Sequence, residues 1–172
     1  SFNYFFIYQR LQNKMEKQVP LIILGSARKQ SDTKSFVKEV FSETAHKQLD
    51  LLDYTITPYD YDGIYPADDF NKLAEEILQH DTIVFATPVY WYAMSAVMKQ
   101  VFDRITDLVT IRKSTGRLLK GKTIFLIAVG DDAKIPEGFE IPFKNTAGYL
   151  DMNYGGSIYF STGHEADADQ KS

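Results

Sequence analysis

The stretch 82–104 constrains the fold more than any other part of this chain. Its first segment, Thr82–Thr87, is short and mainly apolar, which is typical of a strand buried on both faces of a sheet. A loop of proline and aromatic residues, Pro88–Met94, follows directly, and the spacing of apolar residues predicts an amphipathic helix over Ser95–Asp107. A buried strand that leads at once into a helix is the repeating unit of a parallel sheet.

The same unit recurs before and after this stretch. Two stretches of the chain show neither strand nor helix patterns and are predicted as connections. They are the Tyr- and Asp-rich loop Thr57–Asp69 and the basic, polar segment Ile111–Lys122. We expect Asp32 or Thr33 to cap the first predicted helix, since either side chain can accept a hydrogen bond from a free backbone N–H. Apolar runs predict further strands at Leu21–Gly25, Asp50–Ile56, Thr123–Val129 and Asn153–Phe160, and helical spacing predicts helices at Thr33–Leu49, Phe70–Gln79 and Pro142–Met152.

Five strands that alternate with helices predict an α/β fold with a parallel sheet and right-handed crossovers. By analogy within that class, we expect a flavodoxin-like three-layer sandwich, with strand order 2-1-3-4-5 and helices on both faces. The length of 172 residues suits one domain, which we place at residues 15–163. Residues 1–14 are interpreted as an N-terminal extension, or alternatively as an arm that packs on a partner subunit. Residues 164–172 read as a polar, disordered tail.

The composition excludes several kinds of site. The absence of cysteine rules out disulfides, thiol nucleophiles and iron–sulfur clusters, and it is consistent with a cytoplasmic protein. His46, His80 and His164 lie far apart in the sequence and have no paired metal-ligand spacing. A net charge of −4 argues against general binding of nucleic acid or anionic membranes. No apolar run approaches the ~20 residues of a membrane helix. From the histidine spacing, the net charge and the absence of such a run, we expect no metal, nucleic-acid or membrane partner.

The loop after the first predicted strand has the donors that a phosphate group requires. The segment Ser26–Thr33 contains hydroxyl side chains, the cation Arg28 and the free N–H groups of a helix start. The alternative is an ordinary solvated loop with a helix cap. The pattern Gly-x4-Gly-Lys-Ser/Thr of phosphate loops and the three spaced glycines of dinucleotide-binding loops are both absent.

Two further loops are expected at the same edge of the sheet, because ligands bind outside the carboxyl ends of parallel strands. In the loop 88–94, Tyr90, Trp91 and Tyr92 can form a platform for a flat ring, or alternatively bury at a subunit interface. The third loop, Gly130–Asp132, is short, and Gly130 either permits close approach of a ligand or forms a plain turn. Phosphate donors beside a ring platform match flavin mononucleotide (FMN).

Two segments, LIILGSARKQSDT and TPVYWYAMSAVMKQVFDR, resemble the NADPH-dependent FMN reductase family of flavodoxin-like flavoproteins. The first loop of that family reads Gly-Ser-x-Arg-x-x-Ser, and the segment 25–31 matches it position by position. The second loop is similar to the iron–sulfur branch of the family, whose cluster this chain cannot hold without cysteine. Asp103 and Arg104 also match a family motif, and we expect them to hold structure or form intra-helix or intersubunit ion pairs.

The resemblance also implies which residues hold the cofactor. The first loop would bind the FMN phosphate, the second would line the isoalloxazine ring, and backbone N–H groups near the third would face the polar edge of the ring. No side chain is expected to act as a catalytic acid or base. The cofactor-binding residues that the resemblance implies are Ser26, Arg28, Ser31, Thr33, Pro88, Val89, Tyr90, Trp91, Tyr92 and Met94. From their positions in the first and third loops, we also expect Asp32 and Gly130 to contact the cofactor.

The activity that the resemblance implies is that of an FMN-dependent oxidoreductase. NADPH or NADH would reduce the flavin, and a small acceptor, such as a quinone, free flavin, azo or nitro compound or metal ion, would then take the electrons. The alternatives are a flavodoxin-type electron carrier without its own substrate and a non-redox interaction protein on the same fold. Apolar surface on the aromatic loop and the helix after it favours a homodimer, with a tetramer as a further alternative.

Overall fold

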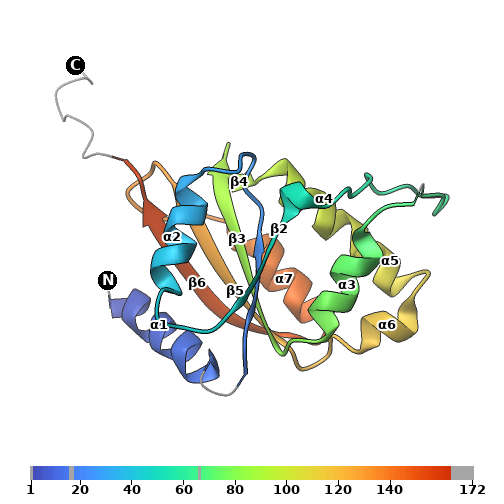
Figure 1. Cartoon of the computed structure of the whole chain (residues 1–172), viewed down its shortest axis with the longest axis horizontal. Coiled ribbons are helices and arrows are strands. Elements are labelled where there is room, and N and C mark those ends of the chain that lie inside the picture. The colour runs from blue at the N-terminus through green and yellow to red at the C-terminus, as the bar shows by residue number, and fades with distance from the viewer. Residues whose placement is uncertain (1, 16–17, 66, 164–172) are drawn as a thin grey trace.

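The computed structural model describes residues 2–15, 18–65 and 67–163 of the chain. Its strands are β1 (Leu21–Leu24), β2 (Lys47–Asp50), β3 (Thr82–Tyr90), β4 (Ala93–Met94), β5 (Thr123–Gly130) and β6 (Asn153–Ser161). A parallel sheet has the order β2-β1-β3-β5-β6, and the short β4 pairs antiparallel with the end of β3 (Figure 1). Apart from β4, this is the predicted order 2-1-3-4-5, so the flavodoxin-like fold class is confirmed.

Helices cover both faces of this sheet and complete a three-layer arrangement (Figure 1). They are α1 (Phe2–Met15), α2 (Asp32–Val40), α3 (Phe70–Leu78), α4 (Ala96–Arg104), α5 (Thr106–Val109), α6 (Lys113–Arg117) and α7 (Ile141–Tyr149). Because alternate residues of a strand face opposite sides, Leu21 and Ile23 of β1 pack with α3, α4 and α7, whereas Ile22 packs with α1 and α2. Within the described residues, no helix is both long and apolar enough to cross a membrane.

The second strand lies earlier than predicted. β2 ends at Asp50, where the predicted strand Asp50–Ile56 begins, and Leu51–Asp53 forms a short 3-10 helix, η1. The Asp50 side chain caps η1 by accepting a hydrogen bond from the Leu52 N–H (3.0 Å). β2 is an edge strand with exposed and half-buried side chains, so no apolar run marks it. The prediction of a helix as far as Leu49 is wrong for the same reason.

Other local predictions also change. Ser31, rather than Asp32 or Thr33, caps α2, because its side chain accepts a hydrogen bond from the Lys34 N–H (3.1 Å). The polar segment 111–122 contains the short helix α6. The predicted loop 88–94 is mostly strand, since β3 continues to Tyr90 and turns directly into β4. The third loop is longer than predicted, because β5 ends at residue 130 and α7 begins at 141.

Helix α1 packs against β6, on the same side of the sheet as α2. Leu11 is fully buried in one apolar cluster with Ile22 and Phe41. A β-carbon at Gly156, whose φ is +120°, would lie 3.0 Å from Cδ1 of Ile7, so glycine allows the helix to approach the strand. That residues 1–14 are an extension stays a prediction, and the predicted tail 164–172 lies outside the described residues.

The guanidinium of Arg104, at the end of α4, holds the loop between η1 and α3. It forms ion pairs with Asp68 and with Asp107 (2.9 Å), and all three side chains are nearly inaccessible to solvent. It also donates to the Thr57 carbonyl (3.0 Å) and lies 3.6 Å from the centre of the Tyr65 ring. The structural role expected for Arg104 is confirmed. Its neighbour in the motif, Asp103, forms an exposed intra-helix pair with Lys99.

Arg104→Met should destabilise the protein by about 3–5 kcal/mol, because it leaves the carboxylates of Asp68 and Asp107 buried without their cation. The measurement is the free energy of unfolding from urea denaturation followed by circular dichroism. Lys99→Met removes an exposed cation from the same helix and should cost less than about 1 kcal/mol. Equal losses in the two variants would contradict a special role for the buried pair.

The buried carboxyl group of Asp68 should make stability depend on pH. Burial alone would raise its pKa, but hydrogen bonds from Arg104 and Thr57 outweigh burial and lower the pKa from 3.8 to about 2. Because the folded pKa is below the unfolded one, the stabilisation is complete above about pH 5 and is lost as the pH falls towards 2. The stability difference between wild type and Asp68→Asn should therefore shrink by about 2 kcal/mol over that range in urea titrations. A difference that is independent of pH would show that the carboxyl titrates normally.

Candidate functional site

The carboxyl ends of β1 and β3 are tied together by Ser95. Its hydroxyl donates to the Gly25 carbonyl (2.5 Å), and its backbone N–H donates to the Thr87 hydroxyl (3.0 Å). The same hydroxyl oxygen accepts a hydrogen bond from the Met98 N–H (3.2 Å) and so caps α4. Ser95 is buried, and it fixes the loop after β1 relative to the segment that follows β3.

The first predicted loop brings hydroxyl groups to the start of α2. Ser26 Oγ lies 2.8 Å from Ser31 Oγ. Thr33, in the first turn of the helix, is 2% exposed, and its hydroxyl has no hydrogen-bond partner within the described residues. The backbone N–H groups of the first turn also lack intrahelical acceptors. The loop therefore offers several neutral donors at the positive end of a helix, as the sequence predicts.

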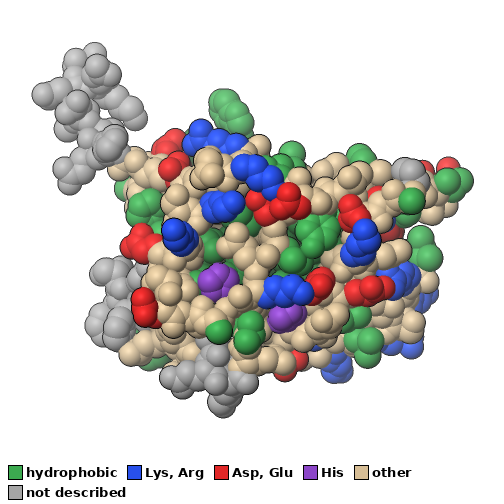
Figure 2. Space-filling view, in the orientation of Figure 1, with side chains coloured by type: hydrophobic (Ala, Val, Ile, Leu, Met, Phe, Trp, Pro, Cys, Tyr) green, Lys and Arg blue, Asp and Glu red, His purple; other side chains and the backbone are tan. Residues whose placement is uncertain are grey.

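Charged side chains of both signs surround this loop, and Figure 2 shows them gathered beside the start of α2. Lys29 Nζ lies 2.5 Å from Asp53 and 3.3 Å from Asp50, and the hydrogen bond to Asp53 is the main cause that raises the pKa of Lys29. Arg28 is mostly exposed, and its one ion pair within the described part of the chain is with the exposed carboxylate of Asp32, at 3.8 Å. Lys29 thus fastens the loop to the end of β2, while Arg28 is available to bind an anion.

β3 and β4 form a hairpin whose two turn residues are Trp91 and Tyr92. Their φ angles are 48° and 64°, in the left-handed region that a two-residue type I′ turn requires and that Asn and Gly normally occupy. Each aromatic residue there carries backbone strain of about 1–3 kcal/mol. Trp91 is 93% exposed, so little packing within the described chain compensates for the strain.

A cavity of about 670 Å³ lies beside the hairpin. Tyr92 forms one wall, and the connection between β5 and α7 forms the other through residues 132–137, including Ile135 and Pro136. A smaller cavity of about 160 Å³ touches both Tyr92 and Met94. The sequence reasoning missed Ile135 and Pro136, because the predicted loop ended at Asp132. The Pro and Gly residues of the segment 133–138 are the signal that would have extended it.

Gly130 is the last residue of β5, and packing explains why it is glycine. A β-carbon there would lie 2.9 Å from the Tyr159 hydroxyl oxygen and 3.0 Å from Val89 Cβ. The Tyr159 hydroxyl donates to the Asp132 carbonyl (2.9 Å), and burial raises the pKa of this tyrosine. Gly130 therefore lets β6 brace the wall of the larger cavity, and its contact with a cofactor stays a prediction.

The remaining predicted residues differ widely in accessibility. Pro88 is buried inside β3, where it pairs with Val129 of β5, and Met94 is buried in the core below the hairpin. Val89 is half-buried, and Tyr90 is exposed. Tyr90, Trp91 and Tyr92 are thus accessible, whereas Pro88, Val89 and Met94 are wholly or partly buried, and contact of any of them with a cofactor stays a prediction. Within the described residues, no group of three His, Cys, Asp or Glu side chains could hold a metal ion.

The sequence profile of the NADPH-dependent FMN reductase family matches residues 20–167. YwqN of Bacillus subtilis (strain 168), whose name assigns it to the NAD(P)H-dependent FMN-containing oxidoreductases, is 26% identical over 149 residues, covering 80% of this chain and 81% of that protein. YdeQ of the same organism, named an uncharacterized NAD(P)H oxidoreductase, is 40% identical over 91 residues, which is 46% of each chain.

Solved structures share the fold at low sequence identity. The Trp repressor binding protein from Bacillus subtilis has a TM-score of 0.68 and 22% identity, covering 86% of this chain and 87% of that one. General stress protein 14 from Treponema denticola, solved in complex with FMN, has a TM-score of 0.61 and 22% identity, covering 84% and 87%. Since the family profile spans residues 20–167, the chain belongs to the NADPH-dependent FMN reductase family and is an NAD(P)H-dependent FMN oxidoreductase.

Proposed function

We propose that the FMN phosphate lies at the start of α2, that the isoalloxazine ring lies at the hairpin, and that electrons from NADPH or NADH reach a small acceptor there. The observation that carries this proposal is the strained aromatic turn of Trp91 and Tyr92, at the same sheet edge as the hydroxyl loop. Backbone strain persists where function requires a geometry that the chain would otherwise avoid, and such residues cluster at ligand sites.

The donor set at the start of α2 fits a phosphate group. Thr33 has a hydroxyl without a partner among the described residues, and Arg28 has an exposed guanidinium, while the hydroxyls of Ser26 and Ser31 can turn toward an anion. The helix dipole adds to the attraction. Asp32 opposes it through its negative charge, and the nearby Arg28 offsets that charge. We therefore assign phosphate binding to the hydroxyls, Arg28 and the backbone, and no direct contact to Asp32.

The hairpin fits a flat ring. Tyr90, Trp91 and Tyr92 are exposed at the end of β3, and the cavity beside Tyr92 has the volume of a typical ligand site. When bound, FMN supplies the hydride acceptor and the electron donor of the reaction. The protein's part is to hold the ring against the hairpin, donate backbone N–H groups to its polar edge, and leave one face open to the nicotinamide and then to the acceptor.

The acceptor is proposed to be a quinone, free flavin, azo or nitro compound, or metal ion that enters the same cavity. Its wall of Ile135 and Pro136 suits flat apolar molecules, and the flanking Lys134 and Glu137 keep the mouth polar. We also propose a cytoplasmic homodimer without nucleic-acid or membrane partners. A second copy would cover aromatic surface on the hairpin, where Trp91 is almost fully exposed.

The test is an absorption spectrum of the protein with FMN, followed by anaerobic addition of NADPH. We expect a bound-flavin spectrum that bleaches within seconds. Bound flavin that stays oxidised, and turns over only with a separate reductase, would favour the flavodoxin-type carrier. Failure to bind FMN would overturn the assignment of both loops.

Arg28→Ala should raise the dissociation constant of FMN about tenfold, since it removes a charged contact to phosphate worth roughly 1.4 kcal/mol. Fluorescence quenching of the flavin on binding gives the constant. Riboflavin, which lacks the phosphate, should bind wild type and variant equally, and Lys38→Ala, which removes an exposed cation further along α2, should leave FMN binding unchanged. An equal loss for riboflavin and FMN would place the effect of Arg28 at the ring instead.

Replacing the turn Trp91–Tyr92 by Asn-Gly should stabilise the fold and weaken the activity. Asn and Gly occupy the left-handed region without the strain of the aromatic residues, so the free energy of unfolding should rise by about 2 kcal/mol. At the same time, loss of the ring platform should lower kcat/KM for NADPH oxidation about tenfold or more. Urea denaturation and steady-state kinetics measure the two effects. A variant that is both less stable and fully active would contradict the functional reading of the strain.

A further inference from the structure

A cavity of about 620 Å³ lies at the edge of the sheet opposite to the candidate FMN site. Lys120 precedes β5, Asp151 precedes β6, and the Gly121 N–H donates to the Asp151 carbonyl (2.9 Å), so this corner is at the amino ends of the strands. β5 alone has 8 residues, which separates the two edges by about 26 Å. A molecule in this cavity would not touch a ring at the hairpin.

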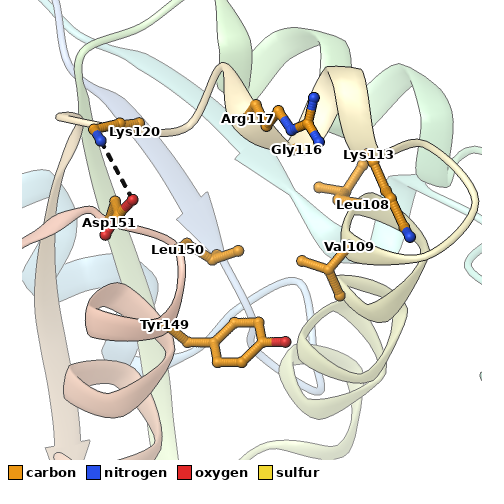
Figure 3. Close-up of a pocket in the computed structure, with 9 residues that line it drawn as sticks. All are labelled: Leu108, Val109, Lys113, Gly116, Arg117, Lys120, Tyr149, Leu150 and Asp151. Atoms are coloured by element: carbon orange, nitrogen blue, oxygen red, sulfur yellow. Dashed lines mark ion pairs between the residues drawn. The ribbon is translucent and has the colours of Figure 1, made fainter.

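The floor of the cavity is apolar. Figure 3 shows the side chains of Leu150 and Val109 facing each other across it, with the Tyr149 ring along one side. Leu108, which also lines the cavity, is buried, and Tyr149 is 77% exposed. A β-carbon at Gly116 would lie only 2.0 Å from the Leu108 carbonyl oxygen, so glycine is required for α6 to pack this closely on α5. The close packing of α6 on α5 therefore fixes one wall of the cavity, and Leu150 and Val109 give it an apolar floor.

The rim of the cavity is basic, although the chain carries a net charge of −4. Lys113, Arg117 and Lys120 line it, against one acid, Asp151, which lies 3.5 Å from Lys120 (Figure 3). Within the residues that the structure describes, neither Lys113 nor Arg117 has an acidic partner. The rim thus holds an excess of two positive charges over an apolar floor.

The other cations of the same basic segment have structural partners. Arg112 donates to the Asn71 side chain (2.5 Å), and the buried Lys122 donates to the carbonyls of Leu78 (2.9 Å) and His80 (2.8 Å). Arg112 and Lys122 thus have structural roles within the fold. No such contact is seen for Lys113 and Arg117 within the described residues, and their position together over the apolar floor suits an anion from outside the chain.

We propose that this cavity binds a small organic anion with a flat apolar body, such as an aromatic carboxylate or sulfonate. The apolar part would lie between Tyr149 and the Leu150–Val109 pair, and the anionic group would pair with Lys113 and Arg117 at the rim. The site is separate from the FMN site, and its occupation does not depend on where the flavin binds.

The test is isothermal titration calorimetry of the FMN-loaded protein with naphthalene-2-sulfonate. We expect saturable binding that leaves the visible flavin spectrum unchanged and weakens as salt is raised. The double variant Lys113→Gln/Arg117→Gln should bind about tenfold more weakly, because it removes both unpaired charges. The matched variant Lys38→Gln/Lys144→Gln removes two exposed lysines that do not line the cavity, and should bind like wild type.

Further measurements separate charge from shape. Tyr149→Ala should weaken naphthalene-2-sulfonate about threefold or more without loss of folding, since the ring is mostly exposed. Inorganic sulfate should bind far more weakly than the naphthalene compound, and neutral 2-naphthol likewise. The proposal would be overturned by any of four results: no binding, equal binding to both double variants, sulfate binding as tight as that of naphthalene-2-sulfonate, or a shift of the flavin spectrum on binding. The proposal would also be overturned if the wild type is a dimer and the variant Lys113→Gln/Arg117→Gln is a monomer. A second copy of the chain would then occupy the cavity.

Discussion

Helix α4 is held at both ends by buried polar groups, and the arrangement of the site depends on this. At its start, Ser95 binds the Gly25 carbonyl and the Thr87 hydroxyl, which belong to two different strand ends. At its end, Arg104 pairs with buried carboxylates, one of them on the loop before α3. A buried polar group that loses its partner costs about 1–3 kcal/mol, and a charged group costs more. α4 therefore cannot move without moving the first loop and the hairpin with it.

The parts of the fold that could be predicted are those that a single local pattern determines. β1, β3 and β5 are buried on both faces, so each appears as an apolar run that needs no knowledge of its neighbours. β2 could not be found this way, because at the edge of the sheet its residues 47–50 are half exposed. The cap of α2, Ser31, lies one residue before Asp32 and two before Thr33, the two residues that the sequence predicts for it. Ser, Asp and Thr all cap helices, and only the extended backbone of Ser31 (φ −148°) selects it.

The candidate site could be predicted in its chemistry but not in its shape. The sequence motif indicated both the hydroxyl loop and the aromatic residues, and the structure brings Ser26 and Ser31 together. A hairpin at Trp91–Tyr92 was not expected, since its sequence has neither the Asn nor the Gly that normally signals a two-residue turn. Residues 133–137 were not anticipated, because they are brought beside Tyr92 by the topology of the sheet rather than by any spacing in the chain.

The two edges of the sheet are joined by a short, continuous path, because α4 leads directly into α5, whose Leu108 and Val109 line the basic cavity. The direct structural route by which an anion in that cavity would influence the flavin is a shift of α4 and α5 between two discrete arrangements. Arg104 stands at the junction of α4 and α5, and its pair with Asp107 fixes the first turn of α5 to the end of α4. A junction held by buried ion pairs resists such a displacement. The same contacts that set the geometry of the candidate FMN site therefore favour thermodynamic independence of the two proposed sites, with binding of the organic anion leaving FMN affinity unchanged.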